Sequence, residues 1–273
     1  MSEFSILHIS DIHLGSHYVP HVGEALLRDA AELAPDMIIA SGDFTQRAKQ
    51  QEFADARALL DALPAVPRIV TPGNHDVPLY RVWERLVDPY RHYRNYISEE
   101  LNTVAEFDHA VVVALNSSAP YSSIVNGWIS SEQLDFASRA FLKADSDKAK
   151  IVVAHHHFAP APDYDRDSIM PRARRALDRF SQLKVDMILG GHLHRAYIGN
   201  SLDVYPGGDR DHGIIIVQSG TSTSRRGRAR EREKNSFNLL HVTATEVHIS
   251  HYLYFDDLGR FAPFSQHRFP RVA

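Results

Sequence analysis

Residues 4–13 read FSILHISDIH, an apolar run that ends in Asp11 and His13. In open α/β sheets, ligands gather outside the carboxyl ends of the strands. Four later segments repeat the arrangement, with a short apolar run that gives way to metal-binding residue types: Gly42-Asp43, Gly73-Asn74-His75-Asp76, His155-His156-His157 and Gly191-His192-Leu193-His194. These segments indicate an α/β protein with a two-metal site at the rim of its sheet structure.

Strand-like runs alternate with helical patterns over most of the chain. The predicted strands are Phe4–Ser10, Met37–Ala40, Arg68–Thr71, Ala110–Leu115, Ile151–Ala154, Val185–Leu189, Gly213–Gln218, Phe237–Val242 and Val247–Phe255. The predicted helices are His21–Leu33, Gln50–Leu63, Tyr80–Glu100 with a break at Pro89, Ser131–Leu142 capped by Ser130, and Arg172–Leu183. No helical pattern follows Leu189, so the last third is expected to be rich in β-structure. Without an internal repeat or a low-complexity linker, one domain over residues 1–273 is expected.

Composition narrows the classes of function. A formal net charge of −4 and a pI near 6.5 exclude a whole-chain field that would draw the protein to nucleic acid or to an anionic membrane. The absence of cysteine excludes disulfides, thiol nucleophiles and Cys-ligated zinc. No signal peptide and no run of membrane-spanning length is recognisable, so a cytoplasmic location without a membrane span is expected.

Two of the segments have the spacing of a chelating pair. In extended backbone, side chains two residues apart lie on the same face, which would let Asp11 and His13 bind one ion, and likewise His192 and His194. Imidazoles combined with one hard oxygen ligand in each segment suit Mn, Fe, Zn or Ni rather than Ca or Mg.

The five segments, in this order, resemble the signature of the calcineurin-like metallophosphoesterases: Asp-x-His, Gly-Asp, Gly-Asn-His-Asp/Glu, a His after a strand, and Gly-His-x-His. The resemblance covers roughly residues 4–195. It implies a four-layer α-β-β-α sandwich of two mixed sheets, with a binuclear metal site at the C-terminal rim of the strands.

The resemblance also implies roles for individual residues. One ion would be held by Asp11, His13, Asp43 and His194, and the other by Asp43, Asn74, His155 and His192. His75 would lie over the substrate as general acid or charge stabiliser, with Asp76 orienting it. Two such ions, with Mn favoured over Fe and Zn, would clamp a phosphoryl group and make a bridging hydroxide available to attack phosphorus.

The fourth segment departs from the common family pattern. Many relatives carry His-His-Pro-Pro, whereas this chain reads HHHFAP at residues 155–160. His155 is the expected ligand because it directly follows a strand. His156 would then point away from the metal, and His157 would line the substrate pocket.

Residues 223–234 contain five arginines and one lysine. As a solvated surface loop, this segment would be partly neutralised by Glu231 and Glu233. As a recognition loop, it would place Arg225 and Arg226 on a substrate phosphate, a nucleotide or a polynucleotide backbone. No aromatic stacking platform accompanies it, so sequence-specific recognition of nucleic acid is not expected.

The resemblance favours a phosphodiesterase of small substrates, because relatives that act on cyclic nucleotides and glycerophosphodiesters share the Gly-Asn-His-Asp segment. The alternatives are a nuclease or a nucleotide-linked lipid pyrophosphatase that uses the loop Arg225–Lys234, a phosphomonoesterase, and a non-catalytic scaffold. The complete ligand set argues against the scaffold. Apolar side chains in Tyr121–Trp128 and Phe261–Phe269 offer surfaces for a homo-oligomer.

Overall fold

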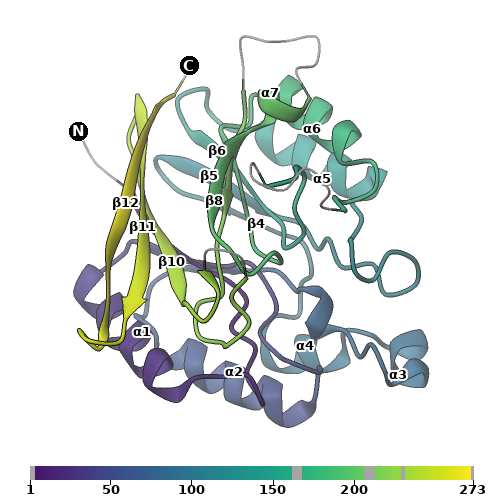
Figure 1. The fold of residues 1–273 in the computed structure, drawn as a ribbon. Coiled ribbons are helices and arrows are strands. Elements are labelled where there is room, and N and C mark those ends of the chain that lie inside the picture. The colour runs from purple at the N-terminus through teal and green to yellow at the C-terminus, as the bar shows by residue number, and fades with distance from the viewer. Residues whose placement is uncertain (1–3, 162–167, 206–212, 229–230, 272–273) are drawn as a thin grey trace.

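The computed structural model describes residues 4–161, 168–205, 213–228 and 231–271, which form two mixed six-stranded sheets (Figure 1). The first sheet has the order β12-β11-β10-β1-β2-β3. Its strands are β1 (Phe4–Ile9), β2 (Met37–Ala40), β3 (Arg68–Val70), β10 (Ser236–Val242), β11 (Glu246–Phe255) and β12 (Arg260–Pro270). The second sheet has the order β4-β5-β6-β7-β9-β8. Its strands are β4 (Thr103–Glu106), β5 (Ala110–Ala114), β6 (Ala149–Val153), β7 (Met187–Gly190), β8 (Tyr197–Asn200) and β9 (Ile215–Gln218).

Three hydrophobic cores show that the sheets and helices form four layers. Successive residues of a strand point to opposite faces, so Ile6 of β1 packs between the two sheets with Val153 of β6, while Leu7 packs on the helical side. The outer core of the first sheet is covered by α1 (Pro20–Leu33), α2 (Gln50–Ala62) and α4 (Arg91–Tyr96). That of the second sheet is covered by α5 (Ser131–Phe141) and α6 (Ala173–Gln182). The predicted α-β-β-α sandwich is confirmed.

The parallel strands explain why the motif segments meet. β1, β2 and β3 are parallel neighbours in one sheet, and β5, β6, β7 and β9 are parallel neighbours in the other. Parallel strands all end at the same edge of their sheet. The segments that follow β1, β2, β3, β6 and β7 therefore converge on one rim, as predicted.

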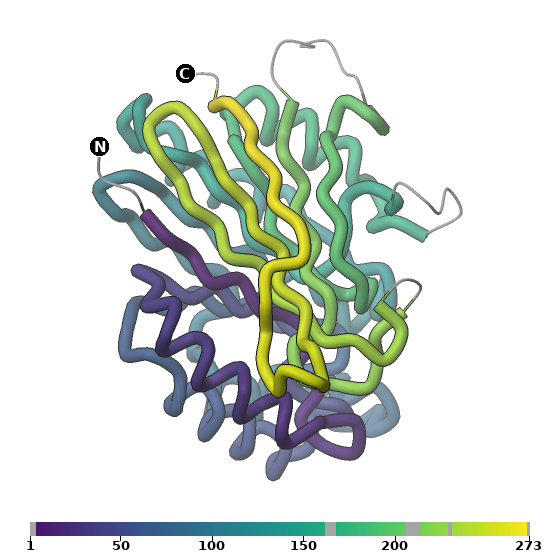
Figure 2. The backbone as a smooth tube through the Cα atoms, turned by 60° about the vertical axis from the view of Figure 1, so that its left-hand side comes forward, coloured from purple at the N-terminus to yellow at the C-terminus, as the bar shows by residue number. Residues whose placement is uncertain are grey.

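The C-terminal strands complete the first sheet by pairing with its N-terminal strand. β10 pairs antiparallel with β1, and Figure 2 shows this yellow-green strand beside the purple N-terminal one. The long strand β12 was not predicted, nor were β4 and β8. The short helix α7 (Ser201–Val204) contradicts the expectation that helical structure ends before residue 190.

The helix predicted over Tyr80–Glu100 is interrupted as expected. α3 (Val82–Val87) and α4 lie on either side of Pro89, whose ring cannot continue a helix. No helix in the described part of the chain has the length and apolar character needed to cross a bilayer. One domain over residues 1–273 stays a prediction.

Candidate metal centre

Four side chains from the two sheets converge at the shared rim. One ligand atom each from Asp11, His13, Asp43 and His194 lies within 4.8 Å of the others. The Nε2 atoms of His13 and His194 are 3.0 Å apart, and Nε2 of His194 is 3.2 Å from Oδ1 of Asp11. Such a set of closely spaced lone pairs suits a shared transition-metal ion.

A second group of ligand atoms adjoins the first. Oδ1 of Asn74 lies 3.3 Å from Nε2 of His155 and 3.0 Å from Nδ1 of His192. Oδ2 of Asp43 is 3.4 Å from Nε2 of His155 and 3.6 Å from Nε2 of His13. One carboxylate oxygen of Asp43 therefore faces both groups, which is the position of a bridging ligand.

The hydrogen bonds and burial of the Asp11 and Asp43 carboxylates favour the binding of cations. Asp11 accepts the backbone N–H of His192 with Oδ2, and Asp43 accepts that of His75 with Oδ1. Their other oxygens, Oδ1 of Asp11 and Oδ2 of Asp43, are buried and accept no hydrogen bond from the described residues. A buried carboxylate oxygen without a donor is costly unless a cation balances it, so these residues fit two metal ions.

The protonation of His155 reflects the same unbalanced charge. Burial alone would lower its pKa, but the Asp43 carboxylate, together with the Asp11 carboxylate and the hydrogen bond to the Ser41 carbonyl, raises the pKa of His155 to about 9. A proton on this imidazole supplies part of the positive charge that the carboxylates require. A metal ion in this place would displace that proton.

Backbone carbonyls orient three of the histidines. Nδ1 of His13, His155 and His194 donates to the carbonyls of Thr45, Ser41 and Arg226, at 3.3, 2.8 and 3.1 Å. These bonds direct each Nε2 into the metal centre, where a bound ion would take its lone pair in place of any proton, as is usual for metal-bound histidines.

The local backbone differs from the extended form that the spacing suggested. Five predicted ligands have positive φ angles between 50° and 75°: Asp11, His13, Asp43, His192 and His194. Residues held in this left-handed region cost of order 1–3 kcal/mol each and collect at functional sites. Asp11 and His13 converge as expected, but through a turn beyond the strand end rather than along a strand face, whereas His192 and His194 fall in different ligand groups, contrary to the expectation that they would bind one ion.

A close approach of two loops fixes the position of Asp43. A Cβ atom on Gly73 would lie 2.1 Å from Oδ1 of Asp43 and 2.5 Å from its backbone nitrogen. Only glycine leaves room for Asp43 and the segment that carries Asn74 and His75 to pack this tightly.

Two of the three consecutive histidines, His156 and His157, are placed differently from the prediction. His156 does not point away, because its ring packs on that of His192 at 4.7 Å and its Nδ1 contacts Oγ of Ser117 at 2.8 Å. His157 stacks on the His192 ring and is only 2% exposed. The role of His157 in substrate binding stays a prediction that this burial does not support.

His75 lies at the edge of the metal centre, and a hydrogen bond to a backbone carbonyl orients its ring. Nδ1 donates to the Gln46 carbonyl at 2.9 Å, which leaves Nε2 toward the pocket, 3.1 Å from Nη1 of Arg226. Burial lowers the pKa of His75, and the Arg226 guanidinium adds to this effect while Asp43 opposes it.

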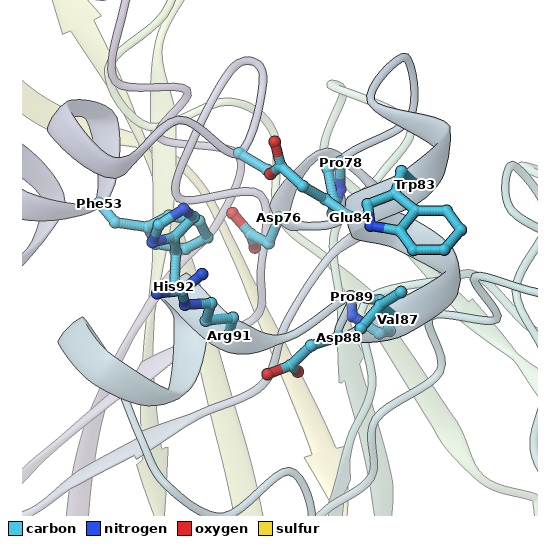
Figure 3. Close-up of a pocket in the computed structure, with 11 residues that line it drawn as sticks. Phe53, Asp76, Pro78, Trp83, Glu84, Val87, Asp88, Pro89, Arg91 and His92 are labelled. Carbon is cyan, nitrogen blue, oxygen red and sulfur yellow. The ribbon is translucent and has the colours of Figure 1, made fainter.

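Asp76 does not orient the His75 ring, contrary to the prediction. Its carboxylate accepts the N–H groups of Gly73, Phe44 and Thr45 at 2.9, 3.2 and 3.0 Å, and so ties two ligand loops together. Burial and the neighbouring Asp43 raise its pKa to about 7. It borders a separate cavity of about 290 Å³, where Figure 3 shows it among Phe53 and Glu84.

A pocket of about 640 Å³ opens beside the metal centre. It is lined by His17, Gln46, Arg47, Lys49, Asn74, His75, Val77, Leu79, Tyr80, Arg81 and Arg226. Arg226 thus reaches the pocket, as expected of the arginine-rich segment, whereas Arg225 is exposed and does not line it. Arg225 as a substrate-binding residue stays a prediction, and Ala229 and Arg230 lie outside the described residues.

Comparisons with known proteins accord with this geometry. A sequence model described as calcineurin-like phosphoesterase matches residues 4–196. A probable cyclic nucleotide phosphodiesterase of Rhodococcus erythropolis is 28% identical over 205 residues, which are 69% of this chain and 64% of that protein. The match thus spans less than two thirds of that relative's length.

Two solved structures share the fold at low identity. A purple acid phosphatase from yellow lupin (Lupinus luteus) seeds has a TM-score of 0.71 at 13% identity, over 99% of this chain and 54% of that one. A dimetal phosphatase from Danio rerio has a TM-score of 0.66 at 11% identity, over 98% and 99% of the two chains. At these identities the likeness establishes the fold alone.

Proposed function

Because this chain belongs to the calcineurin-like phosphoesterase family, we propose that it is a binuclear-metal phosphodiesterase of small substrates. The observation that carries the proposal is the single carboxylate oxygen of Asp43 that faces both ligand groups. Asp11, His13 and His194 would complete one site, and Asn74, His155 and His192 the other. The similarity to a probable cyclic nucleotide phosphodiesterase supports a diester substrate.

The ions, when bound, would polarise the phosphoryl group and supply an activated water near neutral pH. The protein's own side chains would bind the phosphate and donate a proton to the leaving group. Arg226 offers a guanidinium to the phosphate, and His75 presents Nε2 toward the place of the leaving oxygen. As general acid, His75 must carry a proton on Nε2, and a bound phosphate would favour that proton by offsetting the charge of Arg226.

Manganese is the ion we propose first, with iron and zinc as the other candidates, because imidazole, carboxylate and amide ligands admit all three. A cytoplasmic location and a homo-oligomer also belong to the proposal and rest on the sequence.

The test is turnover by chelated protein that is reconstituted with Mn, Fe or Zn. Bis(p-nitrophenyl) phosphate and p-nitrophenyl phosphate would be compared at equal concentration, with the metal content of each sample measured. We expect activity only with metal, about two ions per chain, and preference for the diester. Preference for the monoester would make the protein a phosphomonoesterase, and no turnover with any ion would favour the scaffold.

A further inference from the structure

The pocket beside the metal centre holds more positive charge than one phosphodiester requires. Arg47, Lys49, Arg81 and Arg226 line it, and none of its described lining residues is acidic. A phosphodiester carries a single negative charge, and the metal ions would already balance it. The additional cations therefore call for an additional anion.

Two of these cationic side chains, Arg47 and Lys49, are available to bind such an anion. Arg81 is already engaged, since it donates to the Glu84 carboxylate at 2.8 Å and to the carbonyls of Arg47 and Ala48 at 2.9 and 2.8 Å. In the described part of the chain, no carboxylate lies within 4.0 Å of the charged group of Arg47 or Lys49. We call these two residues the cationic wall.

The backbone beneath the cationic wall is fixed by buried groups. The Glu52 carboxylate accepts the N–H groups of Arg47 and Lys49 at 2.7 and 3.3 Å, and Oγ1 of Thr45 accepts that of Ala48 at 3.1 Å. Ala48 has a φ of 54°, in the left-handed region that residues other than glycine adopt uncommonly. Acidic charge that could have neutralised the wall is thus directed at its backbone instead.

The Arg47 guanidinium is also restrained by an aromatic ring. It lies over the exposed Tyr80 ring, 4.5 Å from the ring centroid. A guanidinium held by an aromatic face loses less conformational freedom when it binds a phosphate. Arg226, by contrast, contacts His75 at the metal end of the pocket. The pocket therefore has a reacting end and a separate anion-binding wall.

We propose that Arg47 and Lys49 bind a second phosphate group of the substrate while the metal centre holds the diester that is cleaved. This inference rests on the proposed function and deepens it. The substrate class is a small phosphodiester that bears a further phosphate, of about the size of a nucleotide, which suits a pocket of about 640 Å³.

Two chromogenic nucleotides that differ only in this phosphate provide the test. They are thymidine 5′-(p-nitrophenyl phosphate) and its 3′-phosphorylated form. With Mn-loaded protein, we expect kcat/KM to be at least about tenfold higher for the 3′-phosphorylated substrate, since charge-assisted hydrogen bonds are the strong ones. In the double variant Arg47→Gln/Lys49→Gln, the preference should fall below about threefold, because the lost contact is one that only the 3′-phosphorylated substrate makes.

The matched control is Lys143→Gln/Arg174→Gln, which removes the same charges from exposed positions just after α5 and within α6. It should keep the full preference. Equal rates on both nucleotides in the native protein, or a preference that survives in the wall variant, would overturn the inference and leave the phosphodiesterase standing. A native protein that cleaves long single-stranded DNA faster than either nucleotide would also overturn it, in favour of a polynucleotide track. No cleavage of any diester would remove the proposed function itself.

Discussion

The metal centre and the cationic wall are neighbours in one pocket but are built in opposite ways. Asp11, His13 and Asp43 are completely buried, and both oxygens of each carboxylate are committed to a backbone donor or to the metal centre. Arg47 and Lys49 are exposed and have no carboxylate partner in the described residues. The residues proposed for the chemistry are thus buried, whereas those proposed to select among substrates are exposed to solvent.

The largest effect should come from Asp43→Asn, which keeps the shape of the shared ligand but removes its charge. The variant should lose at least about 10³-fold in kcat/KM, because the clamp formed by two ions contributes several kcal/mol. It should also bind fewer than two metal ions per chain, measured by elemental analysis. Lys49→Gln is the control from the cationic wall and should keep both ions. Full metal content and activity in Asp43→Asn would show that the carboxylate does not bridge.

His75 lies where the two regions meet, and His75→Ala separates reaction from metal binding. We expect kcat to fall about 10²-fold or more through loss of proton transfer, with the metal content unchanged. Steady-state kinetics and elemental analysis on one preparation would measure both. Loss of metal in this variant would instead show that the His75 side chain supports the metal centre, because alanine keeps the backbone N–H that donates to Asp43.

Gly73→Ala disturbs the metal centre without replacing any proposed ligand. The new methyl group would collide with Asp43, so metal affinity should fall by about 10- to 100-fold, the usual effect of disturbing the groups that position ligands. Gly199→Ala is the matched control, since the nearest atom to its added Cβ is 3.9 Å away. Titration of chelated protein with Mn would measure both. Equal affinities would mean that the loops can separate at little cost.

The smallest effect at neutral pH should come from His8, which lies in β1 behind the metal centre. Burial lowers its pKa to about 3, opposed by Asp11, so the folded protein holds it neutral. The unfolded chain binds more protons between pH 6.5 and 3, so this contribution to stability is complete above pH 6.5 and is lost as the pH falls. His8→Gln should flatten the pH dependence of the free energy of unfolding by at most about 1.4 kcal/mol per pH unit. Urea unfolding of both chelated proteins at pH 7 and pH 5 would measure it, and parallel curves would contradict it.

The sequence predicted the metal centre far better than the cationic wall, for a physical reason. Metal ligands must be of a few residue types, and parallel strands bring their ends to one rim, so the family resemblance could point to Asp11, Asp43 and His155 as ligands, and the structure brings these residues to one rim. Arg47 and Lys49 carry no such constraint, because surface cations follow many strands and most are simply solvated.

Long-range packing accounts for the remaining errors. The orientation of His75 by the Gln46 carbonyl, and the use of Asp76 to join two loops, depend on how separate loops meet after folding. His156 joins the ligand group because Ser117, from a different strand connection, turns its ring. No local pattern in the histidine triplet contains that information.

The pairing of β1 with β10 sets an order of events during synthesis. A ribosome has made all seven predicted ligands once His194 is complete, yet the carbonyl of Asp11 accepts its bond from Thr221, 210 residues later, and β1 gains its second neighbour only with β10. Until those residues emerge, the first motif has an open sheet edge beside it and lacks one of its supports. We therefore expect metal capture to be among the last steps of the protein's maturation.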